Sequence, residues 1–235
     1  MEEYERRLAH AVDNTWVVRP PRQALATFGT TSVRYYLVTE PVYPELDATA
    51  KPGEETVVRE GVVRAERPHV VTPYYLMRHE GFGGDAREYF EQLMRELGPD
   101  APGLLYTYKN EGMETTIVSG AAREVAERIG DRLDRDNLPL EAVIRGVDDL
   151  WDVSLMKFIY ELTGSSARSN ASELRSLGLL ETDGGVPRAA RERIDRLLDR
   201  ARRGSVEPSE VHRELERWGL LDEYQDRFLG LFKRR

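Results

Sequence analysis

Apolar and polar positions alternate in several runs near the start of the chain, as they do in strands that bury one face. β-Branched and aromatic residues dominate these runs, which favours extended structure. In the first run Val33, Tyr35 and Leu37 share one face. Gly61 marks the place of a bulge in the second, and the prolines of the third are typical of a sheet edge. The runs that we predict as strands are residues 31–40, 56–66 and 67–77.

The spacing of apolar residues then changes to the three- and four-residue period of helices. Between two such helical segments, residues 104–120 predict a hairpin whose turn is Asn110-Glu111-Gly112, because Gly112 can take a positive φ. Ser119 lies at the start of the second segment, in which Val125, Ile129 and Leu133 form one stripe. The helices that we predict in this half cover residues 2–12, 85–97 and 121–136.

Strands followed by helices in this order predict an α+β domain over residues 1–136, with a mostly antiparallel sheet and helices on one face. We expect this domain to bind a ligand or a partner. From residue 137 onward the pattern is helical apart from one short hairpin, so we predict a helical domain over residues 137–235. Its predicted helices cover residues 139–146, 149–163, 169–178, 187–203, 207–218 and 222–233.

The last of these helices carries a stripe of apolar residues. Four large side chains fall at positions i, i+4, i+7 and i+8, and burying them would contribute roughly 1.5–3 kcal/mol each. We therefore predict that the C-terminal segment docks on its own domain, around Leu215 and Trp218. The four residues are Tyr224, Phe228, Leu231 and Phe232.

Residues 154–185 resemble a winged helix-turn-helix, with a turn over residues 163–170 and a wing at the Thr-Asp-Gly-Gly sequence. Short donors and arginines on such a second helix can reach base edges and phosphates. The residues that we assign to DNA contact are Arg168, Ser169, Asn170, Ser172, Arg175 and Arg188. The alternative is a pair of structural helices with no contact to DNA.

A glycine-rich turn precedes the helix predicted at residue 85, where backbone N–H groups can bind an anion. A histidine and a glutamate beside it could perform acid–base chemistry. The ligand-binding residues that we predict there are His79, Glu80, Gly83, Gly84 and Asp85. The alternative is a flexible connection between strand and helix.

A cluster of aspartates, Asp148, Asp149 and Asp152, could hold Mg²⁺, because two of the carboxylates share a helix face. We favour the simpler interpretation that Asp148 and Asp149 cap a helix beginning near Leu150. The four histidines are scattered, there is no cysteine, and no activated nucleophile stands out. We therefore assign no catalytic residue and no metal ligand, and the cofactor stays open.

The composition, with 40% hydrophobic and 32% charged residues, is that of a water-soluble globular protein, and we predict a cytoplasmic one. No apolar run approaches the ~20 residues that span a bilayer, so we expect no membrane partner. A net charge of −8 means that any contact with nucleic acid must come from a local patch. Residues 168–203, with nine arginines and six acidic residues, are the net-basic stretch.

These observations favour a non-enzymatic binding or regulatory protein, with DNA as a partner of its C-terminal region. One alternative is an enzyme or small-molecule-binding protein that uses the N-terminal sheet and the turn at residues 79–85. A second alternative is a structural subunit whose C-terminal helices assemble with another copy or another protein.

Overall fold

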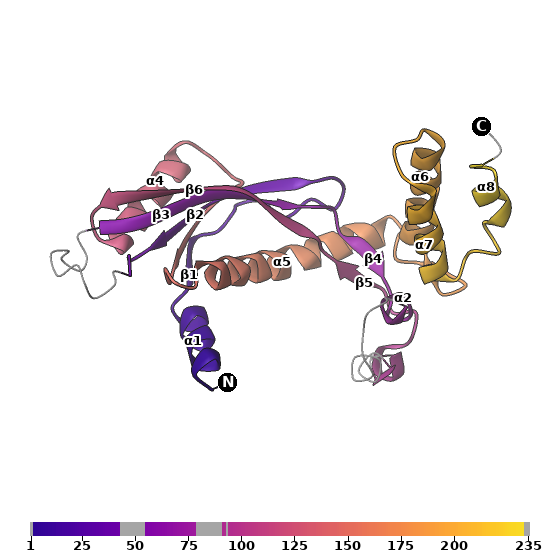
Figure 1. The fold of residues 1–235 in the computed structure, drawn as a ribbon, viewed down its shortest axis with the longest axis horizontal. Coiled ribbons are helices and arrows are strands. Elements are labelled where there is room, and N and C mark those ends of the chain that lie inside the picture. Colours follow the sequence, from indigo (N-terminus) through magenta and orange to yellow (C-terminus); the bar gives the residue numbers. More distant parts are fainter. Residues whose placement is uncertain (1, 43–54, 79–90, 93, 233–235) are drawn as a thin grey trace. The chain divides into compact units, whose positions relative to one another are not determined.

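The computed structural model describes residues 2–42, 55–78, 91–92 and 94–232 (Figure 1). The chain forms two compact units, each built from two separate segments. The first unit comprises Met1–Arg67 and Tyr106–Asn170, and the second comprises Pro68–Leu105 and Ala171–Arg235. This division differs from the boundary that we predicted at residue 136, because the chain leaves the first unit and returns to it.

A five-stranded sheet forms the framework of the first unit, with the strand order β1-β7-β2-β3-β6. All neighbouring strands are antiparallel except β2 and β7, which are parallel. The mixed α+β class, the mostly antiparallel sheet and the first two predicted strands are therefore confirmed. The strands are β1 (Trp16–Arg19), β2 (Thr31–Thr39), β3 (Glu55–Ala65), β6 (Tyr108–Ser119) and β7 (Glu141–Gly146).

Strand β7 lies where we predicted a helix over residues 139–146, and that prediction is wrong. The strand sits between β1 and β2, and Ala142, Val143 and Ile144 are fully buried. A central strand that buries both faces shows no alternation of apolar and polar residues, so its pattern cannot be distinguished from that of a short helix.

The hairpin predicted over residues 104–120 is also absent. Residues 108–119 form the single long strand β6, and residues 103–105 pair with β4 (His69–Val71) as the separate strand β5 (Gly103–Leu105). The expected positive φ of Gly112, 48°, is confirmed, but it belongs to a β-bulge. Gly112 is the extra residue opposite Gly61 and Val62, so the ladder has a bulge at Gly61 as predicted, but the extra residue belongs to β6 and not to the strand of Gly61.

Helices cover both faces of the sheet, whereas we expected them on one face (Figure 1). Alternate residues of β2 explain the difference: Val33, Tyr35 and Leu37 pack against α5 (Trp151–Ser176), whereas Tyr36 and Val38 pack against α4 (Ala122–Arg135). The apolar stripe predicted for α4 is confirmed. Ser119 is the last residue of β6 and not the start of α4, which begins at Ala122 after its N-cap Ala121. The helix predicted over residues 2–12 is present as α1 (Glu2–Asp13), and it precedes β1, a strand that we did not predict.

Helix α5 is continuous for 26 residues, and the predicted turn over residues 163–170 is wrong. The serines of this segment favour turns in isolation, but here they bond to the helix itself. Ser165 and Ser166 both donate to the carbonyl oxygen of Leu162, at 2.9 and 2.7 Å. The helix-turn-helix arrangement inferred from the sequence is therefore not present in these residues.

The region predicted as a helical domain is not helical at its start, because β7 belongs to the sheet of the first unit. The second unit combines short strands with helices. The run predicted as a strand over residues 67–77 is extended only at β4, because Thr72 and Pro73 begin a helix there; Thr72 Oγ1 accepts from Tyr75 N at 3.3 Å. The hairpin expected at the Gly-Gly sequence is present. The elements are β4 (His69–Val71), α2 (Pro73–Met77), β8 (Thr182–Asp183), β9 (Val186–Pro187), α6 (Arg188–Arg202), α7 (Pro208–Trp218) and α8 (Gln225–Leu229).

The C-terminal segment docks on its own unit, as predicted. Tyr224 is buried with Leu215 and Trp218, and Phe228 and Leu231 pack against the same cluster. Phe232, the fourth residue of the predicted stripe, is 57% exposed, so its predicted burial is wrong. Helix α8 is shorter than the predicted helix over residues 222–233.

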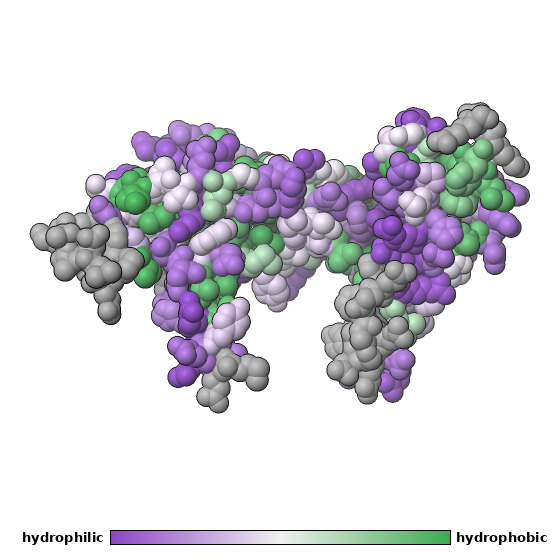
Figure 2. All heavy atoms as spheres, viewed as in Figure 1, coloured by the Kyte–Doolittle hydropathy of each residue, from purple (hydrophilic) through white to green (hydrophobic). Residues whose placement is uncertain are grey.

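Hydrophilic residues cover most of the visible surface, and hydrophobic residues reach it as separate patches (Figure 2). None of the helices in the described part of the chain is long and apolar enough to cross a membrane.

Candidate functional site

The ligand site predicted at the glycine-rich turn lies outside the described residues. The structure does not describe residues 79–90, which include all the predicted ligand-binding residues, His79, Glu80, Gly83, Gly84 and Asp85. The helix predicted over residues 85–97 is described only at residues 91–92 and 94–97, which are helical.

The residues assigned to DNA contact fall in different environments. Asn170 is 1% exposed, and its amide donates to the hydroxyl of Tyr106 at 3.1 Å, so it cannot present its side chain to a base edge. Arg188 forms an ion pair with Glu192 at 3.4 Å. The remaining assigned residues, Arg168, Ser169, Ser172 and Arg175, are exposed.

The net-basic stretch is largely balanced by acidic partners. Among the described residues, arginines of α6 form ion pairs that use up much of the charge available to a polyanion. The pairs are Arg191–Glu223 at 2.5 Å, Arg193–Glu214 at 3.4 Å, Arg196–Glu192 at 3.6 Å and Arg202–Asp199 at 3.2 Å.

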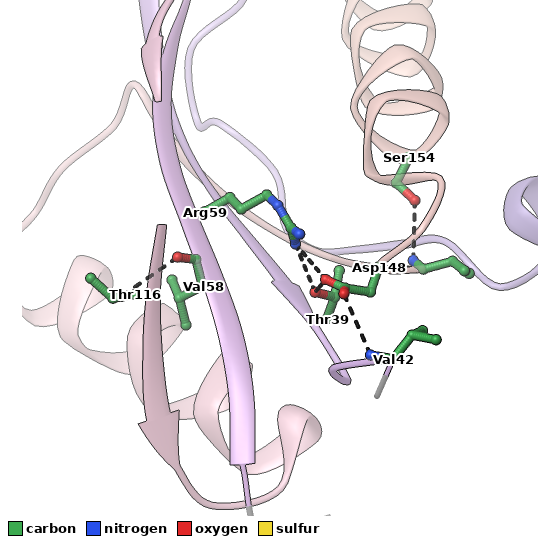
Figure 3. Close-up of polar contacts among 8 residues, drawn as sticks. Thr39, Val42, Val58, Arg59, Thr116, Asp148 and Ser154 are labelled. Atoms are coloured by element: carbon green, nitrogen blue, oxygen red, sulfur yellow. Dashed lines mark hydrogen bonds and ion pairs between the residues drawn. The ribbon is translucent and has the colours of Figure 1, made fainter. Parts of the chain in front are cut away.

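A half-buried polar cluster lies at the carboxyl ends of the parallel strands β2 and β7 (Figure 3). The carboxylate of Asp148 accepts from the hydroxyl of Thr39 at 2.7 Å and from the guanidinium of Arg59 at 2.6 Å. Its second oxygen accepts from the backbone N–H of Val42 at 3.5 Å. The guanidinium of Arg59 also lies 6.0 Å from the ring centre of Trp151.

The environment of Asp148 keeps its carboxyl ionised. Burial raises the pKa, but the hydrogen bonds from Thr39 and Arg59 and the charge of Arg59 outweigh it, so the pKa is lowered overall. The neighbouring Asp149 pairs with Arg7 at 3.0 Å. Asp148 and Asp149 thus each pair with an arginine. We interpret Asp148 as a structural latch, meaning that its bonds to Thr39 and Arg59 hold the connection before α5 against the end of β2 and against β3. No cluster of three or more potential metal ligands occurs in the described part of the chain.

One hollow among the described residues lies in the first unit, beside α5. It has a volume of about 500 Å³, within the range of small-molecule sites. One wall is the segment between β1 and β2, and the other is the middle of α5. We call it the α5 cavity; its lining residues are Val17, Pro20, Pro21, Arg22, Gln23, Ala24, Phe158, Glu161, Leu162 and Ser165.

The first wall of the α5 cavity is anchored on both sides. Arg19 is 6% exposed, and its guanidinium donates to Asp134 at 2.6 Å, to the carbonyl of Leu138 at 3.0 Å and to the carbonyl of Glu141. On the other side, the N–H of Leu25 donates to Ser166 Oγ at 3.0 Å.

Between these anchors the paired prolines at 20 and 21 restrict the backbone. The N–H of Arg22 donates to the carbonyl of Pro139 at 2.8 Å, which fixes the middle of the segment. These bonds order the wall in the absence of a ligand, so binding does not have to order this segment and loses less conformational entropy.

The α5 cavity has an apolar floor and a polar rim. Phe158 and Leu162 are buried members of the core and line the floor. Arg22, Glu161 and Ser165 are exposed and line the rim. The rim thus carries one charge of each sign beside hydrogen-bonding groups.

The two rim charges keep capacity for a ligand. Arg22 lies 2.9 Å from Asp134, but a guanidinium has five donors and can hold a second carboxylate. The pKa of Asp134 is lowered by the hydrogen bond from Arg19 and by both arginine charges, so the pair persists at neutral pH. Glu161 lies 3.8 Å from Lys157 Nζ, beyond hydrogen-bond distance.

Two other hollows in the first unit are more strongly charged. A hollow of about 330 Å³ lies between α1 and the connection before α5, and the Arg7–Asp149 pair belongs to it. A hollow of about 610 Å³ follows one face of α4, and all of its lining residues are charged and on that one helix. Neither offers the apolar floor that small-molecule sites commonly have.

The sequence indicated only part of the α5 cavity. The Arg-Pro-Pro-Arg-Gln sequence at residues 19–23 predicts a break in regular structure, and two prolines followed by polar residues also indicate a rigid exposed segment. Its partner surface on α5 lies much later in the chain, as the bond between Leu25 and Ser166, 141 residues apart, shows. No local pattern could reveal that pairing.

No protein-family model matches the chain, and no curated protein or solved structure is significantly similar to it.

Proposed function

We propose that the protein is a non-enzymatic binding protein whose first unit holds a small amphipathic zwitterion in the α5 cavity. The observation that carries the proposal is the lining of this cavity, with an apolar floor at Phe158 and Leu162 and opposite charges at Arg22 and Glu161. Free amino acids with apolar side chains have the matching chemistry: one apolar group, one carboxylate and one ammonium.

Each part of such a ligand has a partner on the cavity wall. The apolar group would contact Phe158 and Leu162 and leave water, which contributes about 25 cal/mol per Å² of apolar surface. The carboxylate would accept from Arg22, whose planar fork suits a carboxylate. The ammonium would donate to Glu161, and the hydroxyl of Ser165 supplies a further rim contact.

We do not extend the proposal to DNA. The exposed end of α5 and the following hairpin carry acidic residues beside Ser172 and Arg175, and these would repel phosphates. The acidic residues are Glu173, Glu181 and Asp183.

Thermal unfolding in the presence of each of the twenty amino acids tests the proposal. We expect leucine, phenylalanine and methionine to raise the melting temperature, because a ligand that binds only the folded state stabilises it by about 1.4 kcal/mol at ten times Kd. Glycine lacks the apolar group and should have little effect. The absence of any amino-acid-dependent shift would contradict the proposal.

Charge variants identify the site of any shift. Arg22→Gln and Glu161→Gln should each raise the Kd for phenylalanine about tenfold or more, since charge-assisted hydrogen bonds contribute about 1.5–3 kcal/mol. The shift in melting temperature at a given phenylalanine concentration should fall accordingly. Matched controls are Arg128→Gln on α4 and Asp152→Asn on α5, which change exposed charges away from the cavity lining. Equal effects in the rim variants and the controls would place the binding elsewhere.

A further inference from the structure

The five-stranded sheet has two edges, and they differ in how they are protected from other strands. Exposed edges are templates for pairing with another chain unless they are short, charged, bulged or blocked by proline. The β1 edge has four residues and is followed by Pro20 and Pro21. The β6 edge has twelve residues, and most of them are exposed. The β6 edge is therefore the one open to pairing.

The protective features of β6 are concentrated in its first half. Lys109 and Glu111 carry charge there, and the bulge at Gly112 interrupts the ladder. After the bulge, residues 113–119 pair regularly with β3 and read Met-Glu-Thr-Thr-Ile-Val-Ser. This segment has one charged residue, no proline and several β-branched residues, and Ile117 is 62% exposed. It has the character of a pairing edge.

We infer that residues 113–119 pair antiparallel with the same residues of a second copy of this chain, with Thr116 on the two-fold axis. In this register Thr115 lies opposite the partner's Ile117, and Met113 lies opposite the partner's Ser119. Glu114 faces the partner's Val118. The two five-stranded sheets then form one continuous sheet of ten strands.

The sequence of the segment is compatible with itself, which favours a second copy over an unrelated strand. The two-fold register places no like charges opposite each other, a juxtaposition that would destabilise the pair. Alternate residues 113, 115, 117 and 119 share one face. Each Ile117 is therefore a diagonal neighbour of the partner's Ile117 and Met113, so the pairing covers the most exposed apolar residue of the strand.

This inference is independent of the proposed ligand. The α5 cavity includes Val17 of β1, at the opposite edge of the sheet, so the paired copies leave it accessible. A ligand that fails to bind would not affect the dimer.

Sedimentation velocity of the full chain over a range of concentrations tests the pairing. The wild type should show a concentration-dependent dimer. Thr115→Lys with Ile117→Lys places lysine opposite lysine twice and should give a monomer. Thr115→Glu with Ile117→Lys places glutamate opposite lysine twice in the same register and should restore a dimer that weakens with salt. Tyr160→Lys, at an 80% exposed position of α5, is the matched control and should leave the dimer unchanged.

Cysteine cross-linking gives a second, register-specific measurement, because the chain has no cysteine of its own. Thr116→Cys places two thiols opposite each other across the axis and should form a disulfide-linked dimer on mild oxidation. Tyr160→Cys should form at least tenfold less of the disulfide-linked dimer under the same conditions. Circular dichroism confirms that each variant is folded. The inference is overturned by a wild type that stays monomeric at the highest concentration tested, by a double-lysine variant that stays dimeric, by a glutamate–lysine variant that stays monomeric, or by equal cross-linking of both cysteine variants.

Discussion

Replacing Asp148 by asparagine tests whether the polar cluster at the strand ends is a structural latch. The substitution preserves shape but removes the charge that holds Arg59. If the amide oxygen keeps the bonds from Thr39 and Arg59, the amide N–H₂ faces the backbone N–H of Val42, which is also a donor. Breaking a buried ion pair costs about 3–5 kcal/mol. The side chains of Arg59 and Asp148 remain 13% and 17% exposed, so we expect a loss of about 2–3 kcal/mol.

The adjacent residue supplies a matched control. Asp149 also pairs with an arginine, but its side chain and that of Arg7 are 44% and 55% exposed. Exposed pairs contribute about 0.2–1 kcal/mol, so Asp149→Asn should cost less than about 1 kcal/mol. The two variants make the same chemical change one residue apart and differ in burial.

Urea unfolding followed by tryptophan fluorescence measures both effects, because Trp16 and Trp151 lie in the first unit. The pKa of Asp148 is lowered in the folded state, so its contribution to stability is complete above the unfolded pKa of about 3.9 and is lost as the pH falls through the folded pKa. The difference between wild type and Asp148→Asn should therefore persist at pH 5–8 and shrink below about pH 4. Equal stabilities of the Asp148→Asn and Asp149→Asn proteins at pH 7 would refute the latch.

Three further predictions concern packing and titration, each measured by urea unfolding. Gly61→Ala would place a Cβ 2.5 Å from the hydroxyl oxygen of Tyr35 and should lower the free energy of unfolding by about 1–3 kcal/mol. The control Gly164→Ala, on α5, meets nothing within 4 Å and should raise the free energy of unfolding by up to about 1 kcal/mol. Changes of the same sign in both variants would contradict the packing argument. Glu214→Gln removes a carboxylate that is 4% exposed and accepts from tyrosine and tryptophan donors, so a loss of about 2–4 kcal/mol is expected, and a neutral result would show that its charge is dispensable. Burial and the charge of a nearby glutamate raise the pKa of Tyr36 to about 12, so its contribution to stability is complete below pH 10 and falls between pH 10 and 12. Tyr36→Phe should lose that part of the pH dependence; an unchanged slope would disprove the assignment.

Local patterns predicted those elements whose burial is one-sided. Helix α4 and the first three residues of the apolar C-terminal stripe, Tyr224, Phe228 and Leu231, were predicted from their helical spacing, because one face of each segment is covered. Strand β7 is buried on both faces and loses the alternation that identifies a strand. Gly112 was predicted correctly as a positive-φ residue, but a hairpin turn and a bulge both require that conformation. Only the pairing of β6 with β3 distinguishes them.

The α5 cavity was beyond prediction for a different reason. Each of its walls has an ordinary local pattern, one a proline break and the other an amphipathic helix. The hydrogen bond from Leu25 to Ser166 and the contacts of Arg19 bring the walls together across more than a hundred residues of sequence. Side chains that form a site only through such long-range contacts leave no spacing signal in the sequence.

Methyl-labelled NMR with phenylalanine as the probe shows directly whether an apolar amino acid binds in the α5 cavity. Val17 and Leu162 are the residues of the α5 cavity lining that carry isopropyl methyl groups. If phenylalanine binds there, their methyl signals shift during the titration and show contacts to its aromatic protons, while the methyls of Leu215 in the second unit stay unchanged. Shifts confined to the second unit, or no shifts at millimolar phenylalanine, which corresponds to a binding free energy weaker than about −4 kcal/mol, would contradict that binding.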